Sequence, residues 1–86
     1  MQVRRLDDVL GSARHIRTDN WDSARILLAA DGMGFSLHVT TLYAGTVNPM
    51  WYRHHLEAVY CIGGRARLTD LGTGEEYDIV PGTLYA

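Results

Sequence analysis

"GTVNPMWYRHHLEAVYCIGG", residues 45–64, is a run of strand-forming side chains with glycines at both ends. From residue 56 to residue 62 every position is apolar or aromatic except Glu57, which predicts a buried strand. Burying an unpaired carboxylate is costly, so a buried Glu57 must be neutralised, ion-paired or bound to a metal ion. From the residues alone the alternatives stay open: an ion pair with Arg53, an exposed position on an edge strand, or metal binding.

Turn motifs rich in glycine, proline, asparagine and aspartate divide the rest of the chain into short runs of β-forming residues. The sequence predicts five strands, roughly at 24–30, 35–43, 50–62, 66–71 and 75–80. Before them it predicts a short strand at 2–5 and a turn of helix capped by Asp7. Strands this short and this closely spaced are typical of an antiparallel sandwich or barrel.

Alternation within the predicted strand 35–43 separates two kinds of side chain. Phe35, Leu37 and Val39 fall on one face, whereas His38 and Thr40 fall on the other. The polar face is either solvent-facing or the wall of a pocket.

Length and charge restrict the possible classes of protein. The 86 residues make one small domain, 1–86, and a chain of this size buries only about 60 to 65% of its unfolded surface. The formal charge is -2 and all eight basic residues are scattered arginines, so no nucleic-acid partner is expected.

Cysteine content and hydropathy predict the compartment. The chain has one cysteine, so it forms no internal disulfide, which fits a reducing compartment. Its N-terminus does not look like a signal peptide, and no apolar run approaches the roughly 18 residues that span a bilayer. We expect a cytoplasmic protein that does not enter membranes.

The spacing within the quoted stretch resembles the first cupin motif, G-x5-H-x-H-x3-E-x6-G. The matching positions are Gly45, Trp51, Arg53, Glu57 and Gly64, so the glycines and glutamate are present and both histidines are replaced. The segment "PGTLY", 81–85, resembles a shortened second motif with Tyr85 in place of its histidine. The resemblance implies an all-β, cupin-type antiparallel barrel of jelly-roll kind that lacks the usual metal ligands.

Four ordered blocks then resemble one cupin family, the ectoine synthases. They are "NWDSARILL" (20–28), "DGMGFSLHVTTLYAG" (31–45), "YRHHLEAVYCIGG" (52–64) and "PGTLYA" (81–86). Four blocks in order are far more specific than the cupin spacing alone.

The resemblance implies a metal site. In that family iron, as Fe2+, is held by a glutamate, a tyrosine and a later histidine. The first two match Glu57 and Tyr85, and the third has no counterpart because the sequence stops at Ala86.

The resemblance also implies a set of substrate-binding and catalytic residues. The substrate-binding positions match Trp21, Arg25, His38, Thr40 and Tyr52. The catalytic positions match Thr40, Tyr52 and His55, although the particular roles of His38 and His55 stay open.

The implied reaction is that of a hydro-lyase. N-gamma-acetyl-L-2,4-diaminobutyrate condenses intramolecularly with loss of water to form ectoine, a compatible solute that serves as an osmoprotectant in the stress response. The resemblance also implies a homodimer. The alternative is a non-catalytic cupin module that binds a small ligand or dimerises, while another small cupin enzyme is disfavoured by the missing histidines.

Members of the family are about half again as long as this sequence. We therefore expect 1–86 to be the N-terminal two-thirds of a longer domain, with the barrel incomplete at the C-terminus. This expectation leaves open whether the 86-residue form is active.

Overall fold

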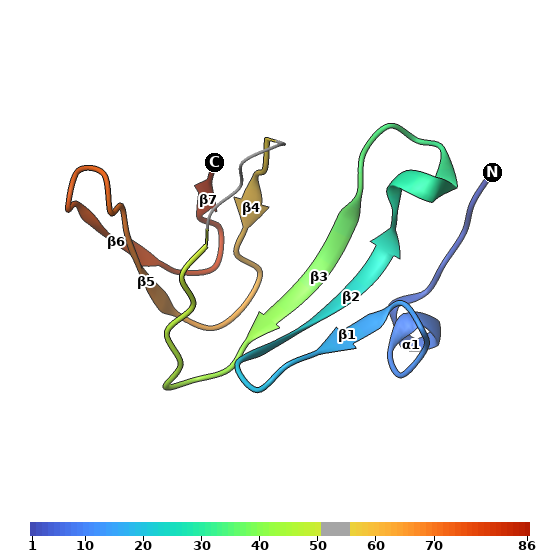
Figure 1. Ribbon diagram of the computed structural model, residues 1–86, viewed down its shortest axis with the longest axis horizontal. Coiled ribbons are helices and arrows are strands. Elements are labelled where there is room, and N and C mark those ends of the chain that lie inside the picture. The colour runs from blue at the N-terminus through green and yellow to red at the C-terminus, as the bar shows by residue number, and fades with distance from the viewer. Residues whose placement is uncertain (51–55) are drawn as a thin grey trace. The chain divides into compact units, whose positions relative to one another are not determined.

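The described part of the chain folds almost entirely into short antiparallel strands (Figure 1). This computed structural model describes residues 1–50 and 56–86. The contacts gather in two compact units, Met1–Pro49 and Met50–Ala86. The longest helix in the described ranges has four residues, and none there is long and apolar enough to cross a membrane. The predicted all-β class is confirmed.

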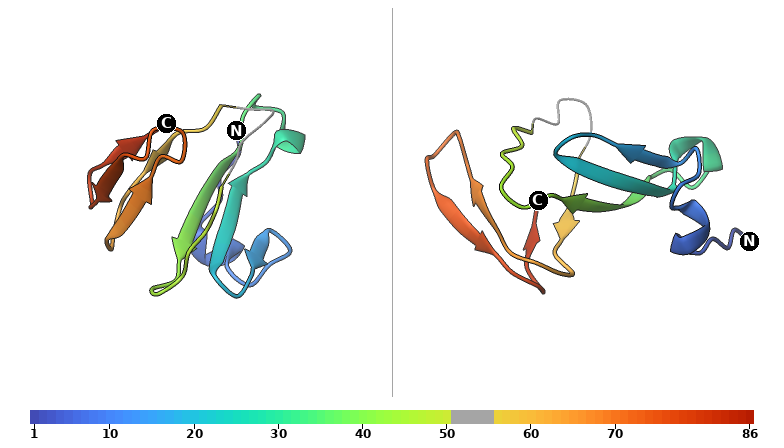
Figure 2. Two further views of the ribbon diagram at one scale, coloured as in Figure 1. Left: turned by 60° about the vertical axis from the view of Figure 1, so that its left-hand side comes forward. Right: turned by 90° about the horizontal axis from the view of Figure 1, so that it is seen from below.

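The first unit is built on a three-stranded antiparallel sheet. Its strands are β1 (His15–Arg17), β2 (Trp21–Leu27) and β3 (Leu37–Leu42), in that order across the sheet. β2 and β3 lie side by side in both views of Figure 2, with Ser23 opposite Thr40 and Arg25 opposite His38. The register shifts between Arg25 and Leu27, as a β-bulge produces.

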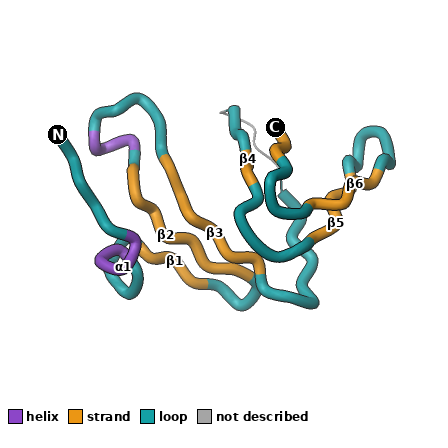
Figure 3. Tube along the Cα trace, turned by 180° about the vertical axis from the view of Figure 1, so that it is seen from behind, coloured by secondary structure: helices purple, strands orange, loops and turns teal. Residues whose placement is uncertain are grey.

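A short helix packs against one face of β2. The helix α1 (Leu6–Val9) packs against β2, and Gly11 just beyond it donates its N–H to the His15 ring at 2.9 Å. Figure 3 shows α1 in purple beside β1. Val9 and Ala24 are only 3% and 1% exposed, so the small core of this unit lies where α1 packs on β2. Residues of β2 that alternate with Ala24 project from the opposite face.

Asp31 ties the N-terminal segment of this unit to the turn after β2. It closes the 3-10 helix η1 (Ala29–Asp31), and its carboxylate accepts the N–H of Leu28 at 2.8 Å. The guanidinium of Arg14 donates to both carboxylate oxygens at 2.9 Å, and Arg4 donates at 3.1 Å. The hydrogen bonds from Arg14 and then from the Leu28 amide hold the pKa of the Asp31 carboxyl well below its ordinary value.

We expect Asp31→Asn to weaken the first unit at neutral pH and to reduce its sensitivity to acid. A carboxyl with a lowered pKa in the folded state stabilises the fold fully above the unfolded pKa of about 3.9, and the stabilisation is lost as pH falls further. Urea unfolding measured at a series of pH values between 7 and 2 checks this. Asp19→Asn, in the exposed turn before β2, is the control. Equal acid sensitivity in wild type and Asp31→Asn would contradict the assignment.

The second unit contains two separate antiparallel pairs. β4 (Val59–Tyr60) pairs with β7 (Leu84–Tyr85), and β5 (Ala66–Thr69) pairs with β6 (Glu76–Ile79). The β5–β6 hairpin is closed by the amide of Asp70, which donates to the carbonyl of Glu75 at 2.8 Å. Ile79, 6% exposed, is the buried hydrophobic residue among those described in this unit.

The glycines at the two ends of the cupin-like motif adopt backbone angles that favour glycine. Gly45 and Gly64 have φ angles of 77° and 74°, in the left-handed region that a side chain disfavours. The turns predicted at both ends of the motif are therefore confirmed.

Several predicted strands are confirmed with different bounds. The strands expected at 35–43, 66–71 and 75–80 are β3, β5 and β6, and the strand expected at 24–30 is β2, which begins three residues earlier. Of the strand expected at 50–62, residues 51–55 lie outside the described residues. Its described remainder forms a strand only at β4, because the ladder with β7 extends over just these two residues.

Two expectations about local structure were wrong, and two strands were not predicted. Residues 2–5 form no strand, because the side chains of Gln2 and Arg4 instead reach Asp31. The helix begins at Leu6, so Asp7 lies inside it and does not cap it. The strands β1 and β7 were missed, since three and two residues are too few to show a periodic pattern.

Candidate functional site

One face of the first unit gathers four of the predicted substrate-binding residues. Trp21 and Arg25 alternate with Ala24 and so project from the face opposite α1. His38 and Thr40 of β3 lie on the same face, because His38 is opposite Arg25 and Thr40 is opposite Ser23. We call these four residues and Ser23 the polar face. Their placement together follows from the register of two strands, while their roles stay predictions.

Ser23 belongs to the polar face but is absent from the residues selected by sequence reasoning. Its hydroxyl lies 2.9 Å from that of Thr40, and the residue is only 5% exposed. The signal that could have found it is its alternation with Trp21 and Arg25 within "WDSAR". The Ser23–Thr40 hydroxyl pair fixes the orientation of a donor and an acceptor on this face.

Arg25 carries a donor that the described chain does not use. Its Nε is buried and has no hydrogen-bond partner within residues 1–50 and 56–86. Buried polar atoms are nearly always hydrogen-bonded, so an orphaned guanidinium nitrogen indicates a place for an acceptor. A carboxylate matches the planar fork of arginine best, because both oxygens can accept from it.

Trp21 is held at the first position of β2 by the turn before it. Its carbonyl accepts from the amide of Thr18 at 2.8 Å and from the Thr18 hydroxyl at 3.0 Å. Its own amide donates to that hydroxyl at 3.1 Å. The backbone of Trp21 is therefore fixed by three hydrogen bonds to a single residue.

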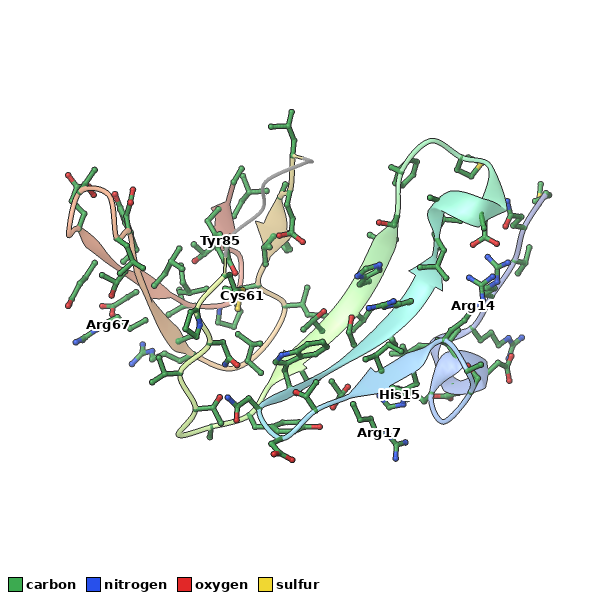
Figure 4. The ribbon with its side chains drawn as sticks, in the orientation of Figure 1. Arg14, His15, Arg17, Cys61, Arg67 and Tyr85 are labelled. Atoms are coloured by element: carbon green, nitrogen blue, oxygen red, sulfur yellow. The ribbon has the colours of Figure 1, made fainter. Side chains whose placement is uncertain are left out.

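The two predicted metal ligands lie near one another in the second unit. Tyr85 is directly opposite Val59, and Glu57 and Cys61 are each two residues from Val59. Figure 4 shows Tyr85 on β7 close to Cys61, which follows β4. Burial, then the negative charge of Glu57 and then Cys61 raise the pKa of the Tyr85 phenol.

The prediction that Glu57 lies in a buried strand was wrong. Glu57 is exposed and precedes β4, and its neighbour Leu56 is 101% exposed, since no described element packs on this segment. Among the described residues, no ion pair occupies the Glu57 carboxylate.

A carboxylate and a phenol are both oxygen donors that iron accepts once they are deprotonated. The chemistry of this pair therefore fits the iron that the resemblance implies. Among the described residues no group of three histidine, cysteine, aspartate or glutamate side chains could hold a metal ion. The structure thus shows two candidate donors and leaves iron binding as a prediction.

Two predicted site residues, Tyr52 and His55, lie outside the described residues. The same holds for Trp51 and Arg53, at the positions of the missing cupin histidines, and for the alternative ion pair between Arg53 and Glu57.

Comparison with known proteins matches the whole chain to one family and its fold to a solved structure. The family model described as ectoine synthase matches residues 1–86. The L-ectoine synthase of Thermobifida fusca (strain YX) is 55% identical over 85 residues, which are 99% of this chain and 63% of that protein. That of Saccharopolyspora erythraea is 49% identical over 85 residues, again 99% of this chain and 63% of the relative.

A solved structure, described as ectoine synthase from P. lautus, superposes with a TM-score of 0.95 at 46% identity. It covers 99% of this chain, and this chain covers 61% of it. The chain thus spans slightly less than two thirds of the length of these relatives.

The fold and the pattern of residues define an all-β protein of the cupin type. Its sequence has Trp51 and Arg53 at the positions of the two histidines of the first cupin motif. The chain belongs to the ectoine synthase family.

Proposed function

We propose that the chain acts in the hydro-lyase reaction that closes N-gamma-acetyl-L-2,4-diaminobutyrate to ectoine with loss of water. The observation that supports this most is the polar face, where register alone places Trp21, Arg25, His38 and Thr40 together. Relatives carrying the name L-ectoine synthase match nearly the whole chain. The substrate carries a carboxylate, an amide and an amine, and the polar face offers groups complementary to these.

In this proposal Arg25 anchors the substrate carboxylate, because its unpaired Nε supplies one donor of a planar fork. Trp21 provides an apolar wall against which the flexible chain of the substrate folds, which brings amine and amide together. The Ser23–Thr40 hydroxyl pair supplies polar contacts beside them. The family resemblance assigns Tyr52 a substrate-binding and catalytic role and His55 a catalytic role.

Glu57 and Tyr85 would hold the iron, together with further ligands. Bound iron would supply Lewis-acid polarisation of the amide carbonyl, a poor electrophile by itself. The raised pKa of the Tyr85 phenol means that its proton must be displaced when it binds a cation. The chain's own contribution is to hold a carboxylate and a phenol close together on neighbouring strand ends.

The proposal includes a single cupin domain over 1–86, a cytoplasmic location, a homodimer and a role in osmotic stress. The single free cysteine supports a reducing compartment. The other three rest on the family resemblance.

Turnover and binding measured side by side test the proposal. The purified protein is loaded with Fe2+ and given the acetylated substrate, with ectoine followed by NMR and binding by calorimetry. Formation of ectoine supports the proposal. Binding without turnover overturns catalysis in favour of the non-catalytic ligand-binding module. Absence of both turnover and binding overturns the enzyme and the ligand-binding module alike.

Tyr85→Phe is expected to remove the visible charge-transfer absorption that a tyrosinate gives to ferric iron, and to weaken iron binding. In the wild type, iron affinity should rise with pH, because binding displaces a phenol proton held by a raised pKa. In Tyr85→Phe this part of the pH dependence should vanish. Absorption spectra of the oxidised, iron-loaded proteins and iron titrations at several pH values check this.

Tyr77→Phe is the matched control for the Tyr85 experiment. Tyr77 is an exposed tyrosine of β6 whose hydroxyl donates to Glu75. It should keep both the absorption band and the pH dependence. A band that survives in Tyr85→Phe would contradict ligation by Tyr85.

A further inference from the structure

A hydrogen-bonded cluster lies on the sheet face opposite the polar face. Asp22 stands between Trp21 and Ser23 in β2, so its side chain projects to the side of α1. One carboxylate oxygen lies 3.1 Å from Nε2 of His15 on β1, and the other accepts the Tyr43 hydroxyl at 2.8 Å. Tyr43 directly follows β3. We call Asp22, His15 and Tyr43 the Asp22 brace, since it joins all three strands.

The contacts of His15 fix its tautomer. Its Nδ1 lies 2.9 Å from the amide of Gly11 and 3.3 Å from the guanidinium of Arg17. Both of these groups can only donate, so Nδ1 carries no proton and Nε2–H donates to Asp22. With both nitrogens engaged and its side chain only 7% exposed, His15 has no free nitrogen for acid–base catalysis. Figure 4 shows His15 and Arg17 together along β1.

The brace is held by charge as well as by hydrogen bonds. The hydrogen bond from His15, followed by that from Tyr43, lowers the pKa of the Asp22 carboxyl. The same carboxylate raises the pKa of the Tyr43 phenol. Asp22 is therefore ionised and Tyr43 neutral at physiological pH, which is the state that favours both hydrogen bonds.

The brace acts on the residue next to it. Trp21 begins β2, and strand ends fray unless neighbouring groups hold them. The turn residue Thr18 holds the Trp21 backbone on one side, and the amide of Tyr43 donates to the carbonyl of Asn20 at 2.9 Å. On its C-terminal side Trp21 is joined directly to Asp22. Movement of Asp22 would therefore be transmitted to the side chain of Trp21.

We infer that the Asp22 brace is a positioning device for Trp21 and thereby tunes substrate affinity from the opposite face of the sheet. This role rests on the proposed function, in which Trp21 is a wall of the substrate site. Asp22 and Tyr43 touch no substrate and are positioning residues. Loss of the brace should raise KM and leave kcat nearly unchanged, because it loosens a binding wall.

The fluorescence of Trp21 reports the brace without any need for turnover. The chain has two tryptophans, so a Trp51→Phe background leaves Trp21 as the single emitter. In this background Asp22→Asn and Tyr43→Phe should each increase acrylamide quenching and lower the anisotropy of Trp21. KM should rise about 2- to 30-fold, which is the range by which substitutions that touch no ligand change binding at a nearby site.

Asp78→Asn is the matched control, because Asp78 is an exposed carboxylate of β6 that lies 3.8 Å from Arg67. It should change neither readout. Tyr43→Phe removes a single oxygen and keeps the ring, so it still reports on the brace if Asp22→Asn does not fold. Unchanged quenching and KM, with a lowered melting temperature alone, would show a merely structural role and overturn the inference. Absence of turnover in the starting protein would overturn the proposed function, and the quenching comparison would then test the brace by itself.

Discussion

Glu57→Ala is expected to lower iron affinity by at least about 10- to 100-fold and to remove ring-closing activity, with the strands intact. Loss of outer-shell partners alone costs metal sites about 10- to 100-fold, so loss of a ligand should cost no less. The fold should survive because Glu57 is exposed and lies outside the strands. Its removal leaves neither a cavity nor an unpaired buried charge.

Iron titration by calorimetry or a competing chelator, with circular dichroism on the same samples, measures both parts of this prediction. Glu76→Ala is the matched control, since Glu76 is an exposed glutamate of β6 whose partner Arg67 is 3.7 Å away. It should bind iron as the wild type does. Undiminished iron binding by Glu57→Ala would exclude Glu57 as a ligand.

Glu57→Gln tests whether iron binding depends on the negative charge of this side chain or only on its size. The amide keeps the size of the side chain and one carbonyl oxygen but loses the negative charge that a hard cation prefers. Iron affinity should therefore fall nearly as far as in the alanine variant. The pKa of the Tyr85 phenol should also fall toward its ordinary value, because the charge of Glu57 is one cause of its rise. A pH titration of tyrosine absorbance in the metal-free protein would show this shift.

Sequence patterns predicted the middle of the sheet well. The alternation in "SLHVTT" correctly placed His38 and Thr40 on one face, because a strand has a period of two residues whatever its tertiary surroundings. Glycine-rich turns located the β5–β6 hairpin for a similar local reason. Pairing partners were beyond such reasoning, since the position of Arg25 opposite His38 depends on register.

The premise about Glu57 shows where sequence reasoning fails. An apolar run from Leu56 to Ile62 predicts burial only if another element packs on it, and periodicity does not say whether one does. In the structure Leu56 and Ile62 are 101% and 75% exposed. The physical case for a buried carboxylate that needs a partner therefore does not hold. What supports Glu57 as a ligand is the family resemblance and its closeness to Tyr85.

The candidate site was likewise only partly predictable from the sequence. Residue types alone would not have selected Trp21 or Thr40, which are common strand residues, and the family blocks were needed to find them. Ser23 was overlooked because a small hydroxyl in a strand gives no chemical signal by itself. Its contact with Thr40 exists only in the folded sheet.

Arg25→Ala is expected to raise KM for the acetylated substrate by about 10- to 150-fold, with a much smaller change in kcat. Hydrogen bonds to charged groups contribute about 1.5–3 kcal/mol, and each 1.4 kcal/mol is a factor of ten. Arg25→Lys should recover only part of the loss, because an ammonium keeps the charge but not the planar fork. Arg67→Ala, at an exposed arginine of β5, should leave KM unchanged.

Thermal stability distinguishes an Arg25 that binds the substrate from an Arg25 that holds the sheet together. In the ligand-free protein the buried Nε of Arg25 lacks a partner among the described residues, which is a cost that the fold carries. Arg25→Met keeps much of the side-chain volume and removes that unsatisfied donor, so the melting temperature should stay the same or rise. If Arg25 instead held the sheet together, Arg25→Met would lower the melting temperature and leave KM nearly unchanged. A stable protein with impaired substrate binding is the result expected of a residue kept for its ligand at some expense to the fold.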